Sequence, residues 1–121
     1  MITTYLNGVA GEVYNGSGVI GDNHPALDDL RIGGRSNAPA GQYFDGRINE
    51  VQVWNVARTG VEILSDMTGS LTGAEAGLLG FWRFNENTGA IVNNLVAANN
   101  DGTLGGGVAG QSPGWPVLAQ A

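Results

Sequence analysis

The segment Arg47–Trp54, read RINEVQVW, restricts the fold most, because it has the longest strand pattern in the chain. Its apolar residues do not keep to one side: Val51 and Val53 alternate with Ile48 and Trp54, so apolar side chains fall on both faces. A strand that is apolar on both faces belongs inside a layered structure and not at its rim. We therefore expect Arg47–Trp54 to be an inner strand.

The carboxylate of Glu50 interrupts this pattern. A carboxylate that is buried in such a strand needs a partner, which can be an arginine, backbone amides or a metal ion.

A short helix is predicted near residues 60–67, directly after this strand. Thr59 and Glu62 have the capping-box spacing, in which each side chain satisfies a free amide of the first helical turn. Gly69 is placed to end the helix. One apolar face of the helix is expected from Val61, Ile63, Leu64 and Met67.

A β-hairpin is predicted at the start of the chain, where Asn7-Gly8 separates Thr3–Asn7 from Val9–Tyr14. Asn-Gly is a strong hairpin signal because both turn residues must adopt positive φ. Gly11 either weakens the second strand or marks a bulge.

Two further strands are expected, Asp29–Gly33 and Leu78–Phe84. The first should point Leu30 and Ile32 inward, and the second should be buried on both faces, with its aromatic rings supplying much of the core energy. A sharp turn is expected at residues 99–102, read NNDG.

The composition agrees with an all-β fold. The 121 residues include 21 glycines, and only 13% are charged, which favours short strands joined by tight turns over helices. A chain of this length forms one domain with one core. We therefore predict a single β-sandwich domain over residues 1–121.

Several function classes are disfavoured by charge and residue content. The net charge is −6 and lysine is absent, whereas nucleic acids and anionic membranes require clustered basic residues. No apolar run approaches the ~20 residues of a membrane span. Catalysis is also not expected: there is no cysteine, the lone His24 lies in a loop, and neighbouring Asp28 and Asp29 point to opposite faces.

Several segments resemble laminin-G-like domains of the concanavalin A-like lectin/glucanase jelly-roll superfamily. The run GRINEVQVWNVART with its helix resembles a closing strand and tail, YLNGV resembles a preceding hairpin, and LRIGG resembles the strand between them. The runs GLLGFWRFNENTG and NNDGTL resemble an opening strand and turn. This resemblance implies an antiparallel jelly-roll-like sandwich with one short helix.

The order of these segments is reversed relative to the family. Residues 1–68 resemble the C-terminal half of the family fold, whereas residues 76–118, with the motifs inside 76–104, resemble its N-terminal strands. The chain could be a permuted sandwich, a piece across the junction of tandem repeats, or a subunit whose edges are completed by another copy. Strands that are apolar on both faces favour some partner, since an uncovered sheet would aggregate.

Calcium is the one cofactor that the resemblance implies, because related domains often hold Ca²⁺ in rim loops through carboxylate and carbonyl oxygens. The candidate ligands are Asp45, Asn99 and Asp101. The alternative is that these residues bond their own backbone amides in Asx turns.

Glycan recognition would use exposed aromatic rings at loops or strand ends, and the candidates are Tyr14, Tyr43 and Trp115. Trp54 and Trp82 are expected to fill the core.

The sequence thus predicts a non-catalytic adhesion or structural module, extracellular or at the cell surface, that self-associates through strand edges as a homo-oligomer or with a neighbouring repeat. The alternative is a carbohydrate-binding, lectin-like module that depends on calcium.

Overall fold

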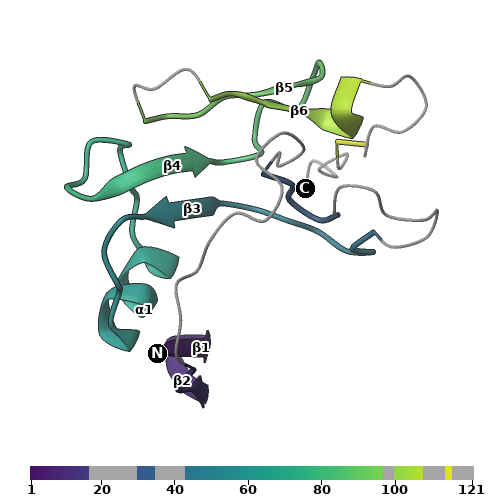
Figure 1. Ribbon diagram of the computed structural model, residues 1–121. Coiled ribbons are helices and arrows are strands. Elements are labelled where there is room, and N and C mark those ends of the chain that lie inside the picture. The colour runs from purple at the N-terminus through teal and green to yellow at the C-terminus, as the bar shows by residue number, and fades with distance from the viewer. Residues whose placement is uncertain (17–29, 35–42, 97–99, 108–113, 116–121) are drawn as a thin grey trace, which may run out of the picture. The chain divides into compact units, whose positions relative to one another are not determined.

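The computed structural model describes residues 1–16, 30–34, 43–96, 100–107 and 114–115 (Figure 1). In these residues the strands form three antiparallel two-stranded sheets, accompanied by one α-helix, α1 (Gly60–Thr68). The chain divides into two compact units, residues 1–48 and 49–121. The strands agree with the predicted all-β class, while the jelly-roll arrangement and the single domain stay predictions.

The first sheet is the predicted hairpin, formed by β1 (Ile2–Leu6) and β2 (Val9–Tyr14). The turn residues Asn7 and Gly8 have φ of 51° and 76°, as a two-residue hairpin turn requires. The Asn-Gly prediction is confirmed.

A bulge interrupts the hairpin beside Gly11. Thr3 pairs with Val13 but Tyr5 pairs with Ala10, so β2 contains one extra residue between these pairs. The extra residue shifts the alternation of side chains between the two faces of β2. One face of the hairpin consequently gathers the apolar side chains of Ile2, Leu6, Val9 and Tyr14.

The second sheet pairs β3 (Val51–Trp54) with β4 (Leu78–Trp82), and Figure 1 shows the two strands side by side. Phe81 is fully buried and its N–H donates to Asn94 Oδ1 at 2.9 Å, while its C=O accepts from Leu95 N at 2.9 Å. The backbone N–H and C=O of Phe81 on the edge of β4 that faces away from β3 are thereby hydrogen-bonded. The buried apolar residues of the described chain are Leu78, Phe81, Trp82 and Val92.

Both strands of this sheet are shorter than predicted. Glu50 has φ of 55° and Phe84 has φ of 57°, and these left-handed residues cannot continue an extended strand. The side chains of β3 are half-buried rather than buried, and Leu79 of β4 is exposed. The prediction that both strands are buried on both faces was therefore wrong in part.

The strand predicted at Asp29–Gly33 does not form in the part of it that the structure describes, residues 30–33. Leu30 is exposed instead of pointing inward, and Gly33 has φ of 76°. Gly33 O accepts a hydrogen bond from Phe44 N at 2.8 Å, so this stretch bends back toward the loop before β3.

The third sheet consists of β5 (Ile91–Val92) and β6 (Gly102–Thr103), followed by the 3₁₀ turn η1 (Leu104–Gly107). Asp101 Oδ1 accepts from Asn94 N at 2.8 Å, and Trp82 Nε1 donates to Asn100 O at 3.0 Å. These two bonds tie the chain before β6 to the neighbourhood of β4. In the described residues, no helix is long and apolar enough to cross a bilayer.

Candidate functional site

The start of α1 is fixed by the predicted capping box. Glu62 N donates to Thr59 Oγ1 at 3.3 Å, and Thr59 N donates to Glu62 Oε2 at 2.8 Å. The backbone and hydroxyl hydrogen bonds from Thr59, with a smaller contribution from the Arg58 charge, hold the pKa of the Glu62 carboxyl below its usual value. The capping-box prediction is confirmed.

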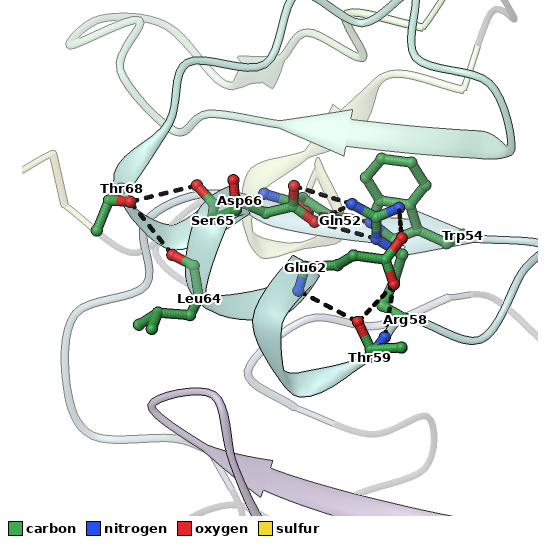
Figure 2. Close-up of polar contacts among 9 residues, drawn as sticks. All are labelled: Gln52, Trp54, Arg58, Thr59, Glu62, Leu64, Ser65, Asp66 and Thr68. Atoms are coloured by element: carbon green, nitrogen blue, oxygen red, sulfur yellow. Dashed lines mark hydrogen bonds and ion pairs between the residues drawn. The ribbon is translucent and has the colours of Figure 1, made fainter.

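Arg58 joins this helix to β3 (Figure 2). Its guanidinium makes a bidentate contact to Asp66, with Nη2–Oδ1 at 3.0 Å and Nε–Oδ2 at 3.1 Å. Nη1 also donates to Glu62 Oε1 at 3.1 Å, and the guanidinium carbon lies 4.1 Å from the centre of the Trp54 ring. One cation thus contacts two carboxylates and an aromatic face.

The helix consequently turns its polar side chains toward Arg58. Asp66 is largely covered, with 13% of its side chain exposed, whereas Val61, Leu64 and Met67 are at least half exposed. Of the four residues predicted to form an apolar face, Ile63 alone is half-buried. Arg58 therefore links the polar side of α1 to the end of β3, whereas most of the predicted apolar face is exposed.

Arg58, Trp54, Glu62 and Asp66 form a group that we call the Arg58 cluster. Beside it lies a polar pocket of about 240 Å³, lined by Asn49, Glu50, Gln52, Asp66 and Met67. Hydrogen bonds from neighbouring residues orient two of its polar side chains, Gln52 and Asp66. Trp54 Nε1 donates to Gln52 Oε1 at 3.1 Å, and Arg58 holds Asp66. The pocket therefore presents preorganised amide and carboxylate groups.

Glu50 is the exposed acid of this pocket. Its carboxylate makes no hydrogen bond or ion pair with any residue that the structure describes. The expectation that Glu50 would be buried and would need a partner was wrong, because the left-handed backbone at this residue places it before the strand instead of inside it.

A second Thr-Gly-x-Glu group precedes β4. Glu75 accepts from Thr72 N at 2.8 Å, from Thr72 Oγ1 at 2.9 Å and from Gly73 N at 3.0 Å. The Thr72 backbone bond is the main cause that lowers the pKa of Glu75 to about 2. This geometry is one half of a capping box, because the Thr72 hydroxyl accepts from Ala74 N and not from Glu75 N. It lies at a tight turn in the connector from α1 to β4, where no helix follows.

A family model described as the concanavalin A-like lectin/glucanases superfamily, of laminin G type, matches residues 1–64. The chain belongs to this superfamily. The match covers the hairpin, β3 and the first turn of α1, which are among the segments whose sequence resembles the family's C-terminal half. No curated protein and no solved structure matches the chain.

The aromatic residues predicted as glycan platforms lie in different surroundings. In the first unit, residues 1–48, Tyr14 and Tyr43 are more than half exposed. Their rings rest against glycines: a Cβ added to Gly16 would lie 2.3 Å from Tyr14 Cε1, and one added to Gly34 would lie 3.1 Å from Tyr43 Cδ1.

Trp115 belongs to the second unit and is half-buried there. Its indole N–H donates to Gly89 O at 2.9 Å. The side chain therefore anchors its segment, which lowers its value as a free sugar platform.

The described residues do not place the three predicted calcium ligands relative to one another. Asn99 lies outside the described residues, and Asp45 and Asp101 belong to different units. Asp101 Oδ1 accepts from the backbone N–H of Asn94, seven residues earlier in the chain, so this bond is not the local Asx turn of the alternative. The described residues contain no group of three acidic or histidine side chains that could hold a metal ion together, whereas Ca²⁺ takes six to eight oxygen ligands, so the calcium site stays a prediction.

Sequence reasoning missed the Arg58 cluster and the pocket beside it. Part of the signal was present, because Arg58 and Glu62 carry opposite charges four residues apart. Arg58 precedes the N-cap Thr59, however, so helix spacing does not predict its contact with Asp66, eight residues later. The Trp54 contact could not be read in this way, since it depends on how the strand meets the helix.

Proposed function

We propose that this chain is a non-catalytic adhesion or structural module, extracellular or at the cell surface, that associates with a second copy or a neighbouring repeat through its strand edges. On this proposal the partner completes a jelly-roll-like sandwich of the superfamily.

The uncovered apolar face of the hairpin carries the proposal. Ile2, Leu6, Val9 and Tyr14 share this face and are each more than half exposed. A two-stranded ribbon is marginally stable by itself in water, and within the described residues each of its strands also has one unpaired edge. A covering sheet or an added strand would satisfy both the apolar face and the open edge.

A second copy is the favoured partner because of the order of the family-like segments. β3 lies in the segment that resembles the family's end, β4 lies in the segment that resembles its beginning, and the two pair within one chain. No segment of the sequence resembles the central strands of the family fold. Strands from another copy or from the next repeat would supply the missing neighbours.

Light scattering from micromolar to nanomolar protein tests this proposal. We expect defined oligomers that dissociate on dilution, and a substitution pair, Leu6→Lys with Val9→Lys, should weaken association about tenfold or more. Leu30→Lys is the matched control, because Leu30 is as exposed as Val9 but lies in a loop. A chain that is monomeric at every concentration would exclude the proposal, as would equal effects of the two sets of substitutions.

The second candidate is a calcium-dependent, carbohydrate-binding module, favoured by the exposed rings of Tyr14 and Tyr43. A glycan array tests it. The wild type should bind a glycan, Tyr14→Ala or Tyr43→Ala should weaken this binding about tenfold, and a calcium chelator should abolish it. Glycan binding that is changed neither by the two substitutions nor by the chelator would reject this candidate.

A further inference from the structure

We propose that the pocket beside Glu50 receives the guanidinium of Arg47 from a second copy of the chain. This inference rests on the self-association proposed above and names one pair of side chains that forms it.

The charge of the pocket region is unbalanced. Glu50, Glu62 and Asp66 bring three carboxylates, and Arg58 is the one cation bonded among them in the described chain. Arg58 is fully used by Glu62 and Asp66, so Glu50 keeps an uncompensated negative charge at the pocket. A cationic group is the complement of such a site.

The other lining residues suit a guanidinium. The amide of Asn49 supplies an oxygen that accepts N–H groups, and Gln52 Oε1, which already accepts from the Trp54 indole, keeps one lone pair for a second donor. Met67 contributes an exposed apolar wall against which the methylene stem of an arginine can lie. A planar guanidinium can bond to a carboxylate through two parallel N–H groups.

Arg47 supplies the matching cation. In the part of the chain that the structure describes, Arg58 and Arg83 are engaged in hydrogen bonds and Arg31 has an interaction of its own, whereas Arg47 is exposed and has none. Arg47 precedes Glu50 by three residues, and no ion pair joins them within the chain. The unpaired cation and the unpaired pocket acid are therefore neighbours along the chain.

Because Arg47 and Glu50 are close along the chain, a two-fold symmetric dimer can form the Arg47–Glu50 contact twice in one interface. In a two-fold interface, a contact from residue 47 of one copy to residue 50 of the other is accompanied by the reverse contact. Two residues spaced three apart lie within about 10 Å of each other along the chain, so both contacts fit in one small interface. The reciprocal pair also offsets the repulsion between two chains that each carry a net charge of −6.

A calcium ion is a weaker occupant. Ca²⁺ takes six to eight oxygen ligands, and of the two carboxylates that line the pocket, Asp66 is already bound to Arg58. A guanidinium requires only the single free carboxylate of Glu50 and one or two amide oxygens.

Charge reversal tests the inference by sedimentation equilibrium of the full chain. Arg47→Glu and Glu50→Arg should each weaken self-association about tenfold or more. An equimolar mixture of the two variants should associate again. In the mixed dimer the two substituted side chains face each other with opposite charges, and the unchanged Glu50 of one variant faces the unchanged Arg47 of the other. This rescue also shows that both variants are folded. As a matched control, Asp45→Arg makes the same charge change as Glu50→Arg but should not rescue Arg47→Glu.

The outcomes separate this inference from the proposed function. Association of the wild type that neither single reversal weakens would overturn the Arg47 contact and leave self-association standing. Loss in both single variants without rescue in the mixture would also overturn the contact. A wild type that is monomeric at all concentrations would overturn both.

Discussion

The guanidinium of Arg58 lies 4.1 Å from the centre of the Trp54 ring while making a bidentate ion pair with Asp66. This arrangement joins the end of β3 to the last turn of α1. It is partly covered, since 22% of the Arg58 side chain is exposed, so water screens it less than a surface ion pair.

The Arg58–Asp66 contact should be measurable as a coupling energy. Arg58→Ala is expected to lower the free energy of unfolding by about 1–3 kcal/mol, because Asp66 would lose its charged partner. A double-mutant cycle with Asp66→Ala, followed by urea denaturation, should give a coupling of about 1 kcal/mol or more. Additive effects of the two substitutions would show that the contact does not stabilise the fold.

Gly80 cannot carry a side chain without moving Trp82. A Cβ at this position would lie 2.4 Å from Trp82 Cη2, and this ring is buried with an exposure of 6%. Gly80→Ala should therefore destabilise the chain by about 1–3 kcal/mol and shift the tryptophan emission, through overpacking. Gly114→Ala, which meets nothing within 4 Å, is the control and should change neither quantity. Equal stabilities of the two variants would contradict the packing of this ring.

The Glu75 turn should make stability depend on acid pH. The pKa of Glu75 falls from its ordinary value of 4.5 to about 2 in the folded chain, so its stabilising contribution is present above pH 4.5 and is lost as the pH falls toward 2. The pKa of Glu62 is also lowered in the folded chain. Glu75→Gln should flatten the dependence of the free energy of unfolding on pH between about 4.5 and 2. An unchanged slope in this variant would contradict the turn geometry.

The capping box of α1 should contribute a measurable share of helix stability. Thr59→Ala removes the hydroxyl that accepts from Glu62 N and should cost about 0.5–2 kcal/mol. Thr59→Ser keeps an equivalent hydroxyl and should remain within about 0.5 kcal/mol of the wild type. Thermal unfolding followed by circular dichroism distinguishes the two, and equal losses in both variants would point to the methyl group instead of the cap.

Local chemistry alone determined several elements of this protein. Asn7-Gly8 sets a hairpin turn because both residues adopt left-handed backbone readily, and Thr59 with Glu62 begins a helix because the two bonds form within one turn. The superfamily was recognisable for the same reason, since its hairpin, closing strand and helix start are contiguous motifs.

Tertiary structure decided what these elements do to one another. Arg58 bonds to the polar side of α1 at the end of β3, although the apolar spacing of the helix predicted that its other side would be covered. The left-handed residues Glu50 and Phe84 set the limits of two strands whose patterns continued beyond them. A periodicity reports which side chains share a face, but partners distant in the sequence decide which face is covered, because the free energy of burial and ion pairing is gained only in the assembled contact.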